Sequence, residues 1–278
     1  MAKKNKLVAP FLKWVGGKRQ LMPEIMQLFP KKFSIYHEPF VGGGAVLFSL
    51  QPKKAIINDA NSELINVYNT IKNNLEELII DLKIHKNESD YFYKIRSLDR
   101  DVSFESMTDV QRASRIIFLN KTCFNGLYRV NSSGEFNSPF GKYANPNIVN
   151  EATLRAVSDY LNSNDVKITN LDYSQILNSV DKNSFVYFDP PYHPVSSSSN
   201  FTGYTQGGFG VDEQIKLRDI CNQLHSNGIK FLLSNSATTL IKEIYADYEI
   251  HKVKANRSIN SDAEKRGEIS EVLIRNYE

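Results

Sequence analysis

Four consecutive residues, Asp189-Pro190-Pro191-Tyr192, bring together a carboxylate, a carbonyl beside a residue without an N–H, and an aromatic ring. The apolar run 185–188 before them has the length and the β-branched and aromatic content of a buried parallel strand. Because prolines cannot donate to a β-ladder, this strand is expected to end at Asp189. The motif therefore predicts a polar site at a strand end.

Such a site suits the chemistry of a planar amine. The exocyclic amino group of adenine or cytosine is a poor nucleophile because its lone pair is delocalised into the ring. Asp189 and the Pro190 carbonyl could accept its two N–H bonds and localise the lone pair, which stabilises the transition state more than the ground state. Tyr192 could stack on the base, a contact worth about 1–3 kcal/mol. A turn that merely ends a strand would have the same residues, so a second motif must decide.

A glycine cluster far upstream is that second motif. Residues 38–44 read Glu-Pro-Phe-Val-Gly-Gly-Gly and precede the helix-compatible run 45–50. This layout is typical of a nucleotide-binding turn, in which missing Cβ atoms let a ligand touch the backbone. The run 54–58 then predicts a second strand, and Asp59 follows it, as in folds that hold ribose hydroxyls with an acid. The pyrophosphate fingerprint G-x-G-x-x-G is absent, so a nucleoside with an amino-acid tail fits better.

These motifs resemble those of amino-methyltransferases that use S-adenosylmethionine. Residues 40–44 match the F-x-G-x-G motif of such enzymes, and residues 189–192 match their catalytic D-P-P-Y motif. Residues 11–18, Phe-Leu-Lys-Trp-Val-Gly-Gly-Lys, resemble the leading motif of the DNA adenine methylase (Dam) family. Segments 125–131 and 134–141 resemble the DNA-reading hairpin of that family. The resemblance covers residues 10–277 and is closest to the GATC-modifying methylases of restriction-modification systems.

The resemblance implies a fold and a reaction. The fold is α/β, with a doubly wound, mostly parallel, Rossmann-like sheet. The reaction is methyl transfer from S-adenosylmethionine to N6 of adenine in duplex DNA within GATC, without a metal, after the base flips into a pocket. The implied catalytic residues are Asp189, Pro190, Pro191 and Tyr192. The implied cofactor-binding residues are Trp14, Lys18, Phe40, Gly42, Gly44, Asp59, Asp172, Tyr173 and Asp189, although Asp172 could equally be a turn-forming residue.

The resemblance also implies how the target sequence is read. Arg129 could donate two bonds to guanine O6 and N7, and Leu127 and Pro139 could contact a thymine methyl group. Lys13 could read the other guanine, and Phe124 could wedge into the base stack. The full set implied to bind DNA is Lys13, Phe124, Asn125, Leu127, Arg129, Asn131 and Pro139. Outside this context, an arginine in a hairpin is usually solvated or bound to phosphate, and a phenylalanine usually belongs to a core.

Periodicity places these motifs in two regions. Helices are expected at 62–72, 75–85, 90–96 and 109–121, and an irregular ribbon or β-hairpin at 124–142. Strands are expected at 166–169, 185–188, 229–233, 248–253 and 269–276. We therefore predict a catalytic domain of residues 1–60 and 160–278, interrupted by a mainly helical target-recognition insert of residues 61–159.

Composition narrows the classes of protein further. The 278 residues carry a net charge of only +3, so the overall charge is a weak sign of nucleic-acid binding. Basic residues are concentrated in two segments, however, which we expect to form a phosphate-contacting face. Residues 1–32 have Lys3, Lys4, Lys6, Lys13, Lys18, Arg19, Lys31 and Lys32, and residues 112–142 have Arg112, Arg115, Lys121, Arg129 and Lys142.

Several absences shape the remaining expectations. The two cysteines, Cys123 and Cys221, are not at metal-site or disulfide-framework spacing. With no apolar run near 18 residues and no signal peptide, we expect a cytoplasmic protein, and with no visible interface motif in a duplex-reading enzyme we expect a monomer. A restriction endonuclease could act on the same site without contact. The polar segment 196–210 could close over a flipped base or be a passive loop.

Three other functions stay open at this point. An RNA adenine N6-methyltransferase could use the same cleft, and a DNA-binding regulator could keep the fold without the activity. A glutamine-modifying enzyme would have Asn in place of Asp189, which makes that function a poor match.

Overall fold

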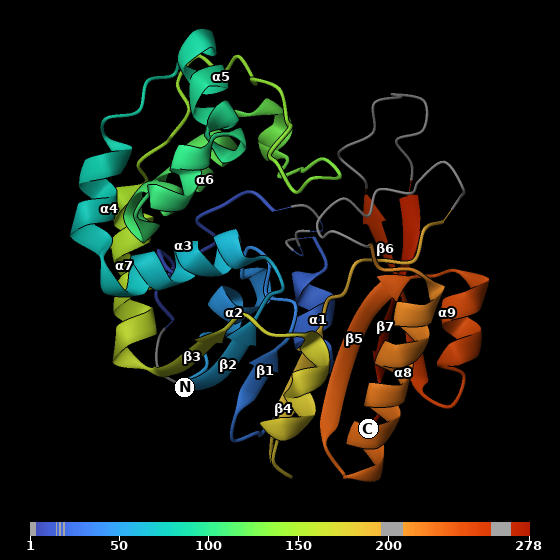
Figure 1. The fold of residues 1–278 in the computed structure, drawn as a ribbon. Coiled ribbons are helices and arrows are strands. Elements are labelled where there is room, and N and C mark those ends of the chain that lie inside the picture. The colour runs from blue at the N-terminus through green and yellow to red at the C-terminus, as the bar shows by residue number, and fades with distance from the viewer. Residues whose placement is uncertain (1–3, 15, 17, 19, 196–207, 257–267) are drawn as a thin grey trace.

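The computed structural model describes residues 4–14, 16, 18, 20–195, 208–256 and 268–278, and the ribbon is drawn in Figure 1. The helices are α1 Met22–Leu28, α2 Ala45–Leu50, α3 Ser62–Asn73, α4 Leu75–Leu82, α5 Ser89–Ser97, α6 Asp109–Thr122, α7 Glu151–Ser163, α8 Val211–Ser226 and α9 Thr239–Ile244. The strands are β1 Tyr36–Glu38, β2 Lys54–Asn58, β3 Asp165–Thr169, β4 Phe185–Phe188, β5 Lys230–Ser236, β6 Glu249–Asn256 and β7 Glu268–Arg275. Short 3₁₀ turns lie at Leu98–Arg100, Val102–Ser106, Phe124–Gly126 and Tyr173–Asn178.

The described strands form one seven-stranded sheet in the order β3-β2-β1-β4-β5-β7-β6. All pairs are parallel except those of β7, which is antiparallel to both β5 and β6. From β1 the chain proceeds outward through β2 and β3, and later returns to the other side of β1 with β4 and β5. The order therefore reverses between β1 and β4, and the crevice outside their carboxyl ends is where open α/β sheets bind ligands. The predicted α/β, mostly parallel sheet is confirmed.

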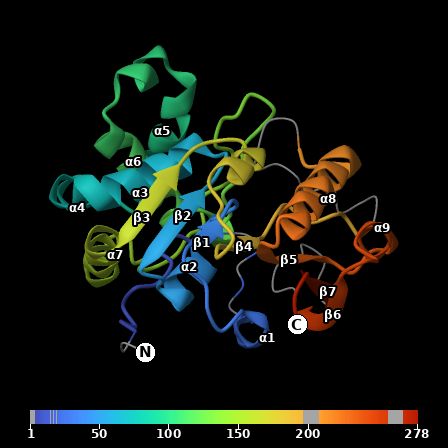
Figure 2. The same cartoon turned by 90° about the horizontal axis from the view of Figure 1, so that it is seen from below.

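Both faces of the sheet are covered. Along β4, Phe185 and Tyr187 pack into one core cluster, whereas Val186 and Phe188 pack into the other. The first cluster includes buried residues of α1, α2, α3 and α7, and the second includes those of α8 and α9. Figure 2 shows α1 and α2 on one side of the sheet and α8 on the other. A strand buried on both sides has no polar alternation, which explains the continuous apolar run before Asp189.

Of the helices between β2 and β3, α5 and α6 stand above the carboxyl edge of the sheet, whereas α7 runs beside β3 (Figure 1). Helix α6 begins with a capping box in which Thr108 and Gln111 each bind the other's backbone N–H. The four predicted helices and the predicted strands all occur within three residues of their expected bounds. Helix α4 ends at Leu82, before the expected His85, whose ring lies 3.0 Å from both the Tyr91 and the Ser114 hydroxyl groups.

Helix α7 was not predicted, and it packs against α3, α4 and β3. Its buried residues share one core cluster with α3 and with the sheet. Packing therefore gives no break at residue 160, and the division into a 61–159 insert and a catalytic domain stays a prediction. The ribbon after α6 has only two isolated antiparallel bridges, Cys123 with Phe140 and Val130 with Phe136. We call residues 123–141 the recognition hairpin.

Candidate active site and recognition hairpin

Asp189 follows the last residue of β4, at the carboxyl edge of the sheet. Its Oδ1 atom lies 2.7 Å from the Nζ atom of Lys18, and the two side chains are 20% and 5% exposed. Lys18 also donates to the carbonyl of Gly16 at 2.6 Å. Burial raises the pKa of Asp189 to about 6, against the opposing effect of the Lys18 charge, and the Glu271 carboxylate adds to the rise. The carboxylate is therefore costly to bury and well suited to accept N–H groups.

Tyr192 completes this site. The Nζ atom of Lys18 lies 4.7 Å from the centre of its ring, and its hydroxyl donates to Glu271 of β7 at 2.9 Å. The ring is thus fixed at one end, with a face turned toward the ammonium group that binds Asp189. The structure brings together Lys18, Asp189 and Tyr192, three residues that the sequence predicted from two motifs, although Lys18 and Asp189 are 171 positions apart.

Buried polar side chains hold the loop after Asp189. Gln214 of α8 donates to the carbonyl of Pro191 at 2.9 Å, and Asn235 of β5 accepts from the backbone N–H of His193 at 3.0 Å. Asn235 also donates to Gln214 at 3.0 Å, so the two amides form one unit. Sequence reasoning missed Gln214, Asn235 and Glu271. Two of them lie on strands, Asn235 after the apolar residues 231–233 of β5 and Glu271 before the apolar residues 272–274 of β7, so a polar residue near the end of an apolar run is the signal that could have found them.

The glycine turn, residues 39–44, links β1 to α2. Gly42 and Gly44 have φ angles of +49° and +72°, in the left-handed region that favours glycine. A Cβ atom on Gly42 would lie 2.8 Å from the Trp14 indole, and one on Gly44 would lie 2.6 Å from both Phe48 and the Tyr68 hydroxyl. The turn is therefore tightly enclosed, and no larger residue fits at either position.

Asp59 holds the glycine turn from the next strand. Its two carboxylate oxygens accept the backbone N–H groups of Gly42 and Asn61, at 3.0 and 2.9 Å. The Tyr68 hydroxyl donates to the carbonyl of Gly42 at 2.9 Å. Burial raises the pKa of Asp59 in spite of these two bonds. The structure gives Asp59 a clear part in shaping the turn, and its proposed contact with a ribose stays a prediction.

An aromatic cluster borders the same edge of the sheet. The ring centre of Phe40 lies 5.0 Å from that of Tyr173 and 5.8 Å from that of Phe209. The Tyr173 hydroxyl donates to Glu213 at 2.7 Å. Asp172 accepts the backbone N–H of Ser174 at 3.0 Å and so caps its own 3₁₀ turn. Phe40 and Tyr173 therefore lie together as predicted, and Asp172 has the turn-forming contact that the sequence left open.

The N-terminal arm, the described part of residues 10–18, lies against the recognition hairpin. A Cβ atom on Gly126 would lie 2.4 Å from the Lys13 side chain. The Nζ atom of Lys13 lies 5.1 Å from the ring centre of Tyr143. Phe124 is 54% exposed, Asn125 and Pro139 are exposed, and Leu127 is half-buried. The structure thus gathers these five predicted DNA-binding residues on the arm and the hairpin.

The other two predicted DNA-binding residues are engaged within the hairpin. The Nε atom of Arg129 donates to the Asn137 side chain at 2.6 Å, and Nη2 donates to the Asn137 carbonyl at 3.1 Å. Asn131 donates to Glu135 at 2.6 Å and accepts the backbone N–H groups of Ser133 and Glu135. Asn131 therefore shapes the tip of the hairpin, a structural part that its motif did not predict.

Two of the basic residues expected on a phosphate-contacting face, Lys18 and Arg115, are instead internal. Arg115 is 2% exposed and binds Asp99 at 2.7 Å, and it donates to the carbonyls of Ile95 and Arg96. Arg112 is paired with Glu63, but its side chain is 31% exposed, so its contact with phosphate stays a prediction. The expectation was wrong for Lys18 because it pairs with Asp189, and for Arg115 because α6 packs it against α5 and the turn that carries Asp99, where carboxylate and carbonyl oxygens neutralise it. Net charge counted along a segment does not show which side chains face inward.

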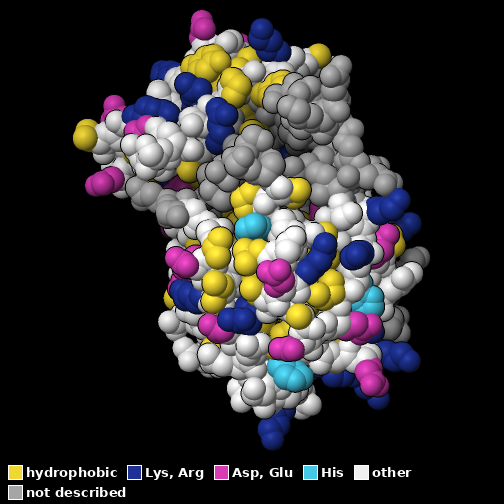
Figure 3. All heavy atoms as spheres, turned by 90° about the vertical axis from the view of Figure 1, so that its right-hand side faces the viewer, with side chains coloured by type: hydrophobic (Ala, Val, Ile, Leu, Met, Phe, Trp, Pro, Cys, Tyr) yellow, Lys and Arg dark blue, Asp and Glu magenta, His cyan; other side chains and the backbone are white. Residues whose placement is uncertain are grey.

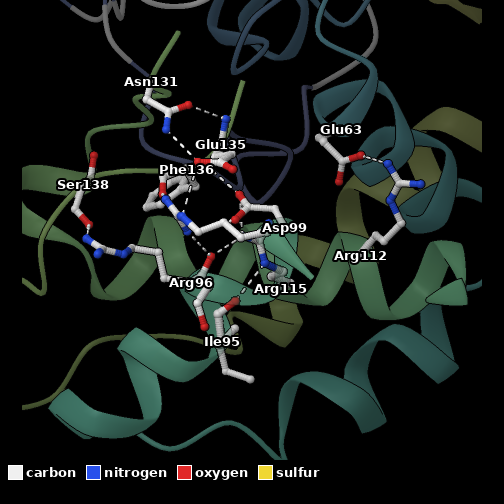
Figure 4. A network of polar contacts seen from close by, with 12 residues as sticks. Glu63, Ile95, Arg96, Asp99, Arg112, Arg115, Asn131, Glu135, Phe136 and Ser138 are labelled. Atoms are coloured by element: carbon white, nitrogen blue, oxygen red, sulfur yellow. Dashed lines mark hydrogen bonds and ion pairs between the residues drawn. The ribbon is translucent and has the colours of Figure 1, made fainter. Parts of the chain in front are cut away.

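The Asp99 carboxylate organises this region (Figure 4). It accepts from Arg115, from Arg100 at 3.0 Å, and from the backbone N–H of Phe136 in the hairpin at 2.7 Å. Arg100 also donates to the carbonyl of Phe136 at 2.9 Å and lies 3.3 Å from Glu135. A buried ion-pair cluster therefore anchors the hairpin to α5 and α6.

The described residues hold neither a helix long and apolar enough to cross a membrane nor a cluster of three or more metal-ligating side chains. Cys123 and Cys221 are buried free thiols. Of the segment 196–210, residues 196–207 lie outside the described residues, as do Lys3 and Arg19.

Comparison with known proteins identifies the family. Residues 14–259 match the model of the D12 class N6 adenine-specific DNA methyltransferase. The chain is 46% identical over 280 residues to the type II methyltransferase M1.LlaDCHI of Lactococcus lactis subsp. cremoris, which covers all of this chain and 99% of the relative. It is 43% identical to the type II methyltransferase M.MjaIII of Methanocaldococcus jannaschii, and the match covers 97% of this chain and 99% of the relative. It is 34% identical to the DNA adenine methylase of Escherichia coli K12, and the match covers 98% of this chain and 95% of the relative. The chain belongs to the D12 class of N6-adenine-specific DNA methyltransferases.

Proposed function

We propose that this adenine-specific DNA methyltransferase modifies the adenine of GATC, with the base rotated out of the duplex into the pocket of Asp189 and Tyr192. The observation that carries the proposal is the position of Lys18. Its amino nitrogen donates to Asp189 at 2.7 Å and lies 4.7 Å over the Tyr192 ring. The Lys18 nitrogen thus already donates to Asp189, as the N6 group of adenine would, and lies over the Tyr192 ring, as the adenine ring would.

The residues at the carboxyl edge also fit S-adenosylmethionine, the methyl donor that membership of the class implies. The Phe40 and Tyr173 rings offer apolar faces to an adenine, Asp59 lies beside the glycine turn as a partner for a ribose, and Asp189 is an anionic partner for a cationic tail. We assign its binding to Trp14, Lys18, Phe40, Gly42, Gly44, Asp59, Asp172, Tyr173 and Asp189. When bound, it supplies a methyl group activated by a sulfonium.

The chain's own groups perform the rest of the reaction. Asp189 and the Pro190 carbonyl accept the two N–H bonds of the target amine, so that the nitrogen lone pair leaves the ring and points at the methyl group. Tyr192, fixed by Glu271, stacks on the base. Lys18 must leave Asp189 for the amine to take this place. Rotating the base out of the duplex costs a few kcal/mol, which the stacking and hydrogen bonds offset.

The arm and the hairpin supply sequence recognition in this proposal. Lys13 and Arg129 read the two guanines, and Leu127 and Pro139 contact a thymine methyl group. Phe124, with more than half of its surface exposed, fills the gap left by the flipped base, and Asn125 binds a neighbouring phosphate. Figure 3 shows acidic and basic side chains interspersed over the lower part of the face that carries α8 and α9. That face has no uniform positive field, which favours the arm and the hairpin as the DNA side.

The test is the modification of plasmid DNA in vitro, followed by digestion with endonucleases blocked by, or dependent on, N6-methyladenine in GATC. Complete protection at every GATC, and none at sites with one base changed, is the expected result. Labelled methyl groups on DNA that is still cut at GATC would refute the assigned sequence and leave the enzyme class intact. A duplex RNA of the same sequence serves as the control acceptor. A partner endonuclease that cuts the same site stays a prediction.

A further inference from the structure

Trp14 lies between the glycine turn and the recognition hairpin. On one side, its side chain is so close to Gly42 and Gly43 that Cβ atoms there would lie 2.8 Å from the indole and 3.0 Å from the Trp14 Cβ atom. On the other side, its ring stacks on that of Tyr128, with the centres 4.9 Å apart and the planes 25° apart. A stacked aromatic pair is worth about 0.5–1.5 kcal/mol beyond the area that it buries. One side chain therefore touches both the turn assigned to the cofactor and the hairpin assigned to DNA.

Tyr128 is the hairpin's side of this contact. It lies between Leu127 and Arg129 in an extended segment, where successive side chains point to opposite sides. Leu127 and Arg129 are half-buried, and Tyr128 is 5% exposed. The segment thus presents two predicted DNA-reading side chains on one side and Tyr128, facing Trp14, on the other. A shift of the backbone toward DNA bases must move Tyr128 as well.

Asn120, in the last turn of α6, joins the same two segments through hydrogen bonds. Its side-chain oxygen accepts the backbone N–H of Lys13 at 2.9 Å. Its side-chain nitrogen donates to the carbonyls of Lys13 at 2.8 Å and Gly126 at 3.0 Å. The side chain is fully buried. One amide therefore holds the residue before Trp14 and the residue two before Tyr128 in a fixed relation.

We propose that Asn120 and Tyr128 are positioning residues that join the arm and the recognition hairpin into one unit, through which DNA and cofactor raise each other's affinity. The unit meets the glycine turn at Trp14, so either ligand fixes the indole in the position that the other ligand needs. Linkage makes the effect reciprocal. This inference rests on the proposed function for the assignment of the two ligand sites.

The chain offers a direct reporter, because Trp14 is its single tryptophan. The probes are S-adenosylhomocysteine, which lacks a methyl group to transfer, and a GATC duplex. Each probe alone is expected to change the emission of Trp14 in the wild-type protein. In Tyr128→Leu the duplex no longer changes the emission, whereas S-adenosylhomocysteine still does. Tyr128→Phe keeps the stacked ring and is expected to behave as the wild type.

Equilibrium binding gives the second readout. In the wild type, saturating S-adenosylhomocysteine is expected to lower the Kd for the duplex by about fivefold or more, and in Tyr128→Leu by less than about twofold. Asn120→Asp keeps the acceptor for Lys13 but loses both donated bonds. It is expected to reduce in the same way the ratio of the duplex Kd without S-adenosylhomocysteine to the duplex Kd with it. Asn162→Asp is a surface control for the loss of two donated bonds, since the exposed Asn162 donates to the Lys72 and Ser158 carbonyls and contacts neither the arm nor the hairpin.

The outcomes separate this inference from the proposed function. If the wild-type protein binds both probes but neither changes the affinity for the other, the coupling is refuted and the assigned sites stand. An unchanged ratio in Tyr128→Leu also refutes it. If S-adenosylhomocysteine does not bind, the assigned cofactor site is refuted instead. Should Tyr128→Leu fail to fold, the wild-type emission and the Asn120→Asp pair still decide the matter.

Discussion

Hydrogen bonds between strands fix the position of Asp189, whereas contacts made by side chains fix the position of Arg129. The first follows β4, whose neighbours β1 and β5 hold it through parallel ladders, so hydrogen bonds of the backbone set its position. The second lies on a ribbon with two isolated bridges, held by the Asp99 cluster on one side and by Asn120 and Trp14 on the other. A reaction needs fixed geometry, which a sheet supplies. A DNA-reading segment held by a few buried polar groups can vary in sequence and target while the sheet is kept.

The largest effect is expected at the sheet edge. Asp189→Ala removes an acceptor that acts on the developing charge of the amine, so the rate of methyl transfer should fall by about 10²–10³-fold or more. Binding of a GATC duplex should change little, because the recognition hairpin keeps its anchors. Single-turnover methyl transfer and duplex Kd, measured on the same preparation, check this. A variant that keeps near-full turnover would remove Asp189 from the catalytic site.

The next largest effect is expected at the anchors of the recognition hairpin. Arg115→Met leaves the buried Asp99 carboxylate without its closest guanidinium partner, and breaking a buried ion pair costs about 3–5 kcal/mol. Denaturant unfolding should show this loss of stability. The remaining folded protein should lose discrimination between GATC and sites with one base changed, since Asp99 binds the hairpin backbone at Phe136.

Arg155→Met is a suitable control for that experiment. Arg155 also pairs with acidic residues, Glu76 and Glu151, but it is 43% exposed and lies on α7. Surface ion pairs contribute little to stability, so its loss should change neither stability nor discrimination by much. Equal losses in the two variants would show that the Asp99 cluster has no special part in holding the hairpin.

The same contrast explains what the sequence could predict. The apolar run of β4, the two prolines and the glycines act on neighbours in the chain, so their pattern predicts the strand, its end and the turn. Arg115, by contrast, meets Asp99 only after α5 and α6 pack, and its burial depends on that partner. The sequence therefore predicted a phosphate-contacting arginine where the structure has a buried ion pair. Asn120, Gln214 and Asn235 were missed because their partners are distant in the chain.

Two glycines offer a matched pair for the two regions. Gly44, at the start of α2, has φ +72° and no room for a Cβ atom, which would lie 2.6 Å from Phe48 and Tyr68. Gly134, at the tip of the recognition hairpin, has φ +82° and nothing within 4 Å. Gly134→Ala should cost only the left-handed strain of about 1–2 kcal/mol. Gly44→Ala adds overpacking of about 1–3 kcal/mol. Thermal unfolding of both variants measures the difference, and equal losses would contradict the enclosed geometry of the turn.

The smallest effect is a pH dependence of methyl transfer at the sheet edge, which duplex binding by the recognition hairpin should not share. Asp189 acts as an acceptor in its carboxylate form, and its pKa is raised to about 6 by burial. As pH falls through about 6 the carboxyl group gains a proton, so kcat/KM, which reports the free enzyme, should fall about tenfold per pH unit below that value. Binding of the duplex in the absence of cofactor should not follow the same curve.

Two substitutions should move the acidic limb of the kcat/KM profile, its fall at low pH, in opposite directions. Glu271→Gln removes a negative charge that raises the pKa of Asp189 and keeps an acceptor for the Tyr192 hydroxyl, so the limb should move to lower pH. Lys18→Met removes the positive charge that lowers this pKa, so the limb should move to higher pH. A limb that stays in place in both variants would mean that a group other than Asp189 sets it. Opposite shifts would identify Asp189 as the titrating acceptor, because among the described residues these two charges are the ones that act on its carboxylate.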